Sequence, residues 1–243
     1  MKNKINVNNI ADSKKITTLI NKLYPICRSI TGKGFTDSLK ILQENMEIKL
    51  SKFKTGSKVL DWTIPKEWNI KDAYVVDPDG KKIIDFKKHN LHVVNYSIPV
   101  NKIISLNELK KKLFTLPKQP NAIPYITSYY KKDWGFCIEY NKFKNLKKGR
   151  YHIYIDSKFT KGNLNYGEIV FPGKSKKEIL FSTYLCHPSL ANNEISGPCV
   201  STYLSKYVKN IKNRYYTYRF IFIPETIGSI GYISKNLNYM KKN

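Results

Sequence analysis

The feature that most constrains the fold is an alternation of apolar runs and a helical pattern between residues 178 and 225. The run EILFSTYL begins at residue 178 and is typical of a strand that is covered on both faces of a sheet. A helical pattern follows at about 193–209, and TYRFIFIP at 217–224 predicts a second buried strand. Strand, helix and strand in this order form a βαβ unit, whose right-handed crossover makes the two strands parallel.

Polar side chains follow both predicted strands. His187 comes just past the first strand and Glu225 just past the second, while Asn193 and Glu194 stand at the start of the connecting helix. Ligands of open parallel sheets bind outside the carboxyl ends of the strands. We therefore expect these side chains to meet at one edge of the sheet and to form a polar site there.

An imidazole and one or two carboxylates are suited to bind Zn²⁺, and a carboxylate that does not bind metal can deprotonate a metal-bound water. A Ser/His/Asp triad is less well supported because no G-x-S-x-G motif occurs, and Gly32-Lys33-Gly34 lacks the spacing of a P-loop. A structural interpretation stays open for each residue. His187 would then cap or pack at a strand end, and Glu194 and Glu225 would be acids at helix N-termini.

The chain preceding this unit changes character twice. Amphipathic helices are predicted at 12–24 and at about 36–46, and short strands dominate from 51 to 172. Asp77-Pro78-Asp79-Gly80 predicts a hairpin turn, and Ser105 with Glu108 predicts a capping box for a helix at about 106–114. We expect a domain formed by 1–50 and 173–243, interrupted by a β-rich inserted domain at 51–172.

The charge of the chain is strongly positive, with 43 Lys and Arg against 18 Asp and Glu and a formal net charge of +25. Such a charge could hold a polyanion by counterion release. Only four of the cations are arginines, however, and the lysines are spread along the whole chain in short clusters. Nucleic-acid binding is therefore a weak alternative to a solvated lysine surface.

Cysteine usage and hydropathy indicate the compartment. The four cysteines lack C-x-x-C spacing, which predicts packed, reduced thiols. No run of 18 apolar residues and no signal-peptide pattern is found. We expect a cytoplasmic protein that does not contact a membrane.

Several motifs resemble a bacterial family of aminopeptidase-like proteins that is often encoded near polysaccharide or surface-glycan genes. They are YPICRSITGKGF at 24–35, NLHVVNYSIPV at 90–100, IPYITSYYKKDWGFC at 123–137, STYLCHPSLANNEISGP at 182–198 and YRFIFIPETIGSIGYIS at 218–234. The resemblance implies an α/β fold with a zinc-exopeptidase-like (phosphorylase/hydrolase-like) core, a mixed sheet and a β-rich inserted domain. It also implies that this chain corresponds to an N-terminal portion, with the core incomplete at the C-terminus.

The resemblance further implies roles for individual residues. His187 matches a metal-binding histidine, and counting back from Ser196-Gly197 places the position that bridges two metals on Asn193. Glu194 is the expected stand-in ligand and Glu225 the expected general base, with one or two zinc ions as cofactor. Arg28 either binds a substrate carboxylate or glycan phosphate, or anchors the N-terminal helix through a salt bridge.

The function expected from these observations is a metal-dependent hydrolase resembling zinc aminopeptidases, which cleaves a peptide or an amino-modified small substrate by metal-activated water. The alternative is a catalytically inactive aminopeptidase-like binding or scaffold protein associated with surface-polysaccharide biosynthesis. Expected partners are a second copy of the chain or a separate chain that supplies the C-terminal part of the core.

Overall fold

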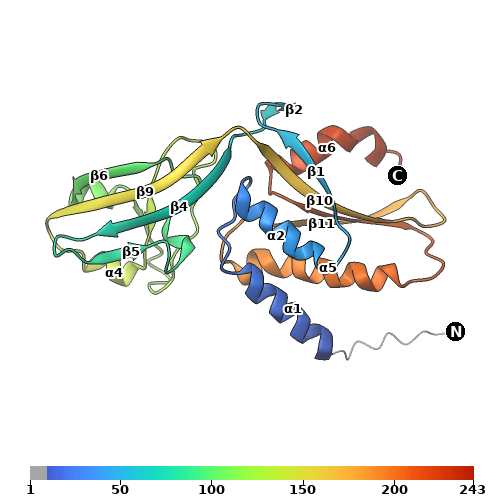
Figure 1. The fold of residues 1–243 in the computed structure, drawn as a ribbon, viewed down its shortest axis with the longest axis horizontal. Coiled ribbons are helices and arrows are strands. Elements are labelled where there is room, and N and C mark those ends of the chain that lie inside the picture. Colours follow the sequence, from blue (N-terminus) through green and yellow to red (C-terminus); the bar gives the residue numbers. More distant parts are fainter. Residues whose placement is uncertain (1–9) are drawn as a thin grey trace. The chain divides into compact units, whose positions relative to one another are not determined.

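A computed structural model describes residues 10–243 of the chain. The chain divides into two compact units, which are described separately (Figure 1). The first unit comprises the described residues from 10 to 65 together with Asn163–Asn243, and the second comprises Lys66–Gly162. The second unit is thus shorter than the predicted insertion at 51–172, because the strands at 49–54 and 163–171 pair with each other inside the first unit.

The first unit is built on a four-stranded mixed sheet in the order β1-β10-β12-β11. β1 (Lys49–Lys54), β10 (Asn163–Phe171) and β12 (Thr217–Ile223) are antiparallel neighbours, and β11 (Glu178–Tyr184) is parallel to β12. A short antiparallel pair, β2 (Lys58–Val59) and β3 (Trp62–Thr63), follows β1. The predicted parallel pair and mixed α/β core are confirmed.

Helices cover both faces of this sheet. Figure 1 shows α2 (Lys33–Gln43) and α5 (Ser196–Lys209) on one face and α6 (Ile227–Met240) on the other, with α1 (Ile10–Leu23) packed against α2 and α5. Under α6, Tyr166, Ile221 and Tyr232 form a buried cluster. Apolar burial on both faces is what holds this layered arrangement together.

The two strands of the crossover differ in burial. Phe220 to Ile223 of β12 are fully buried, whereas every residue of β11 is half-buried or exposed, Leu180 most of all among the apolar ones. The prediction of a strand covered on both faces is therefore wrong for β11. In the sheet formed by the described residues, β11 has only β12 as a neighbour, so its other edge lacks the cover that a central strand receives.

The second unit contains an antiparallel sheet in the order β5-β4-β9-β6. Its elements are β4 (Glu67–Val76), β5 (Lys82–Asp85), the 3₁₀ turn η1 (Asn90–His92), β6 (Val100–Ser105), α3 (Leu106–Lys110), β7 (Leu113–Phe114), β8 (Phe136–Cys137), α4 (Tyr140–Lys144) and β9 (Arg150–Thr160). Two predicted signals are confirmed. Asp77 accepts two main-chain N–H groups in the β4–β5 turn, and Ser105 and Glu108 form the capping box of α3.

Helix α3 is shorter than the predicted 106–114 because the chain returns to a strand at Leu113. The helix predicted at 193–209 begins as a π-helical turn, η2 (Ala191–Ile195), which continues into α5, and Pro198 lies in the first turn of α5. Within residues 10–243, the helices are too short or too polar to cross a membrane.

Candidate metal centre

The parallel strands β11 and β12 bring His187 and Glu225 together. β11 ends at Tyr184 and β12 at Ile223, and these two residues are partners in the register, so the segments that follow leave the sheet side by side. Nε2 of His187 lies 2.6 Å from Oε1 of Glu225. The expectation that both side chains reach the same edge of the sheet agrees with this geometry.

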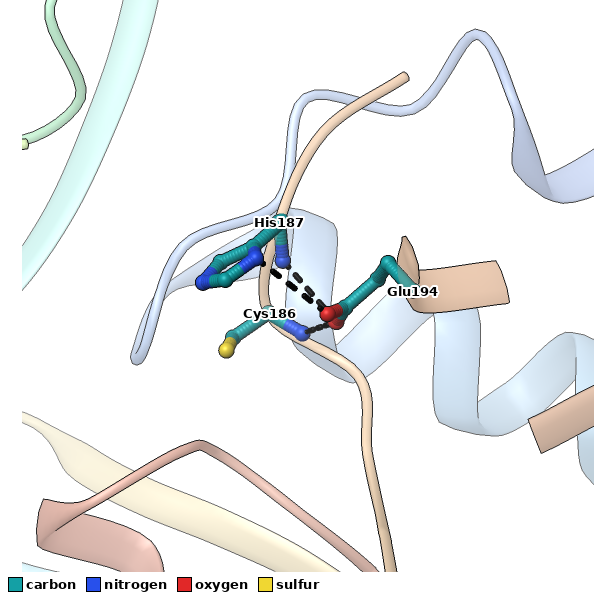
Figure 2. A group of neighbouring side chains, drawn as sticks. All are labelled: Cys186, His187 and Glu194. Carbon is teal, nitrogen blue, oxygen red and sulfur yellow. Dashed lines mark hydrogen bonds and ion pairs between the residues drawn. The ribbon is translucent and has the colours of Figure 1, made fainter. Parts of the chain in front are cut away.

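Glu194 joins this pair from the π-helical turn η2. Its side chain is fully buried, and its Oε1 accepts hydrogen bonds from the main-chain N–H groups of Cys186 and His187, the latter at 2.9 Å (Figure 2). Oε2 accepts no hydrogen bond from any described residue and faces Nδ1 of His187 at 3.4 Å. One carboxylate oxygen therefore fixes the loop, and the other remains available.

The surroundings shift the protonation of both groups. Burial raises the pKa of Glu194, and the charge of His187 opposes this only in part. Burial lowers the pKa of His187, but the hydrogen bond to Glu225 and the charge of Glu194 outweigh it, so that the pKa of His187 is raised overall. The two neighbouring carboxylates thus favour the protonated form of the imidazole.

Cys186 belongs to the same cluster. The sequence predicted only a packed, reduced thiol for this residue. One ligand atom from each of Cys186, His187 and Glu194 can be chosen so that all three lie within 4.8 Å of one another. The Sγ atom accepts the N–H of Glu225 at 3.3 Å, and burial raises the pKa of the thiol well above its usual value. The only sequence signal that places Cys186 in this cluster is its position directly before His187.

Asn193 lies beside the cluster, with its Oδ1 atom 3.4 Å from Nδ1 of His187. The hydroxyl of Tyr184 donates to the main-chain oxygen of Asn193 at 3.0 Å. The position that the resemblance assigns to a bridging acid is therefore close to the histidine, but it carries a neutral amide.

Arg28 binds the main chain of the site rather than facing the metal-ligand cluster. Its side chain is fully buried, and its guanidinium donates to the main-chain oxygen of Leu23 at 2.6 Å and to that of His187 at 2.7 Å. A substrate has no access to such a side chain in this conformation. The geometry thus favours the anchoring alternative over substrate binding, although the anchor consists of hydrogen bonds to carbonyl groups.

The donor set fits a zinc ion. His187 supplies an imidazole, and Glu194 supplies a buried carboxylate oxygen without a hydrogen bond from the described residues, both of which are zinc ligands in proteins. Glu225 is about one-third exposed and adjoins them. We conclude that His187 and Glu194 could hold the metal that the fold family implies, with Cys186 within reach.

Comparisons with known proteins agree with this fold. A protein of Clostridium acetobutylicum, provisionally named a polysaccharide biosynthesis protein with an aminopeptidase-like domain, is 47% identical over 239 residues, which are 98% of this chain and 55% of that protein. A crystal structure of a provisionally named peptidase from the same organism matches with a TM-score of 0.91 and 47% identity, over 95% of this chain and 55% of that one. The chain thus spans about half the length of these relatives.

Zinc aminopeptidase folds are also similar at low identity. The zinc aminopeptidase of Bacillus subtilis matches with a TM-score of 0.61 and 13% identity, over 91% of this chain and 64% of the enzyme. An M28 peptidase precursor of Shewanella amazonensis matches with a TM-score of 0.58 and 9% identity, over 96% of this chain and 72% of that one. These two likenesses establish the fold of the chain.

The model of one protein family matches residues 17–243, nearly the whole chain. Its description is a domain of unknown function, DUF4910. The chain therefore belongs to the DUF4910 family and has the fold of the zinc aminopeptidases.

Proposed function

We propose that the chain carries part of the active site of a metal-dependent hydrolase of the aminopeptidase type. The observation that carries this proposal is Oε2 of Glu194, a buried carboxylate oxygen that accepts no hydrogen bond from residues 10–243 and lies beside His187. A buried charged oxygen is costly unless a cation neutralises it. A zinc ion held by His187 and Glu194 would supply that charge.

Bound zinc would supply the Lewis acidity that activates water for attack on an amide. The residues of the chain have distinct tasks around it. Glu194 keeps the loop of Cys186 and His187 in place through Oε1 and offers Oε2 as a ligand. Glu225 is partly exposed, so it can accept a proton at its carboxylate and release it to solvent, as a general base must.

The proposed substrate is a peptide or a small molecule in which an amide adjoins a free amino group. The similarity to zinc aminopeptidases supports the reaction class. The name of the Clostridium acetobutylicum relative supports a setting in polysaccharide biosynthesis. Because the chain spans about half of that relative, the activity of a whole enzyme of this kind is part of the proposal.

Calorimetric titration of the metal-stripped protein with Zn²⁺ tests the ligand assignment. The unmodified chain should bind near-stoichiometric zinc, and His187→Ala and Glu194→Gln should each weaken binding by about one to two orders of magnitude or more. His152→Ala is the matched control, because His152 lies on β9 of the second unit and bonds Asn101 there. Equal losses in the control and the site variants would contradict the assignment.

A binding or scaffold protein that has lost catalysis is the second candidate, and Asn193 is the observation in its favour. A neutral amide at the predicted bridging position is a poorer metal ligand than a carboxylate. This candidate predicts that the metal-stripped chain binds no zinc at micromolar concentrations. Zinc binding that depends on His187, followed by release of amino acids from aminopeptidase substrates, would refute it.

A further inference from the structure

The second unit contains a hollow that the proposed metal centre does not use. It has a volume of about 590 Å³, in the range of small-molecule sites, and lies between β5 on one side and α4 with the loop that follows on the other. Its lining includes the buried side chains of His92, Ile138 and Tyr151. These residues belong to η1, the segment after β8 and strand β9, so the elements of the unit itself shape the base of the hollow.

Five lysines line this hollow. They are Lys81, Lys82 and Lys88 around β5 and Lys142 and Lys147 around α4. The two acidic side chains of the lining serve local turns, since Asp77 accepts the N–H groups of Asp79 and Lys81 and Asp85 accepts that of Lys87. Positive charge therefore dominates the lining, and a concave surface of one sign concentrates the field and attracts anions.

The lysines differ in how far acidic side chains compensate them. Lys142 bonds Glu139 at 2.7 Å, and Lys147 pairs with Asp79. Among the residues that the structure describes, no carboxylate lies within ion-pair distance of Nζ of Lys81 or Lys88. Lys81 and Lys88, near β5, are thus two cations that can pair with an anionic ligand.

Acceptor atoms complete the lining. The Nδ2 atom of Asn141 donates to Asn121 at 2.8 Å, and that of Asn145 donates to the main-chain oxygen of Asn141 at 3.0 Å. Nδ1 of His92 lies 2.8 Å from the oxygen of Cys137, which can only accept, so Nδ1 carries the proton. These bonds leave Oδ1 of each asparagine and Nε2 of His92 as acceptors, which suits the hydroxyl groups of a ligand.

We propose that this hollow binds a small organic phosphate that carries hydroxyl groups, with the phosphate at Lys81 and Lys88 and the hydroxyl groups toward Asn141 and Asn145. Lysine binds phosphate as a point charge, and the described lining residues include five lysines. This proposal is independent of the metal centre, which lies in the first unit.

The test uses the 243-residue chain and three probes, namely glucose 1-phosphate, inorganic phosphate and glucose, titrated by calorimetry and by ¹H–¹⁵N NMR. Glucose 1-phosphate should bind saturably, at least about tenfold more tightly than either of its two parts. The amide signals that shift when glucose 1-phosphate is added should belong to residues 81–88 and 141–147. A hollow that merely attracts phosphate would bind inorganic phosphate equally well, which would overturn the hydroxyl part of the proposal.

Charge-matched variants separate a site from general surface charge. The double variant Lys81→Gln with Lys88→Gln should lower the affinity for glucose 1-phosphate by about tenfold or more. The control is Lys174→Gln with Lys176→Gln, two exposed lysines of the first unit, which should change this affinity by less than about twofold. Asn145→Ala should lower the affinity for glucose 1-phosphate and leave the affinity for inorganic phosphate unchanged. Equal losses in the two double variants, or no saturable binding by the unmodified chain, would overturn the proposal.

Discussion

Replacing Arg28 by methionine should destabilise the first unit strongly. The guanidinium is fully buried and donates to the main-chain oxygens of Leu23 and His187 at 2.6 and 2.7 Å. Methionine keeps the apolar contacts of the side chain but removes both donors, and hydrogen bonds from charged groups contribute about 1.5–3 kcal/mol each. Loss of the buried charge returns part of its desolvation cost, so we expect a net loss of about 2–4 kcal/mol in the free energy of unfolding.

Hydrogen exchange of the β12 amides measures this loss within the first unit. Arg214→Met is the matched control, because Arg214 also donates to main-chain oxygens, those of Val208, Lys209 and Ile211, from a half-buried position. Water can replace its bonds, so we expect a loss below about 1 kcal/mol. Similar losses for the two variants, or a loss below about 1 kcal/mol for Arg28→Met, would refute the assignment of Arg28 as an anchor.

Three further substitutions test the packing and charges of the first unit. Gly34→Ala should cost more than about 2 kcal/mol in urea unfolding, because the added Cβ would collide with the main-chain oxygen of Cys27; Gly56→Ala meets no atom and should cost only about 1 kcal/mol for its φ of +87°. Burial raises the pKa of Glu178, but hydrogen bonds from Arg219 outweigh this and lower it overall. The Glu178–Arg219 pair therefore stabilises the fold above the pKa that Glu178 has in the unfolded chain. This stabilisation is lost as pH falls through the lowered pKa of Glu178 in the folded chain. Arg219→Gln should therefore flatten the decline in unfolding free energy between about pH 5 and 3, and an unchanged slope would contradict this reasoning.

The sequence predicted the crossover of the first unit and the meeting of His187 with Glu225. This prediction succeeded because both facts depend on local patterns, namely an apolar run, a helical repeat and a second apolar run. A crossover through a helix makes the two strands parallel, and their common direction determines which ends of the strands meet. The β4–β5 turn and the capping box of α3 were predicted for the same reason, since each signal lies within a few residues.

Contacts between distant segments could not be predicted in this way. Arg28 and His187 are 159 residues apart, and no periodicity in either segment indicates that a guanidinium reaches the carbonyl of the histidine. The edges of the inserted unit were missed for a similar reason. The strands at 49–54 and 163–171 show the same local signals as the strands of the insert, and only their mutual pairing assigns them to the first sheet.

The charge of Glu194 separates the structural demands on the site from the functional ones. Oε1 accepts two main-chain N–H groups, but the amide oxygen of a glutamine could do the same without the cost of burying a charge. The second oxygen has no hydrogen bond among the described residues, so holding the loop does not explain why a carboxylate is present. The proposed zinc ion beside His187 would explain it, because it would convert the buried charge from a cost into a ligand. Glu194→Gln is therefore the sharpest variant for the zinc titration, since it keeps the acceptor that holds the loop and removes only the charge that a metal requires.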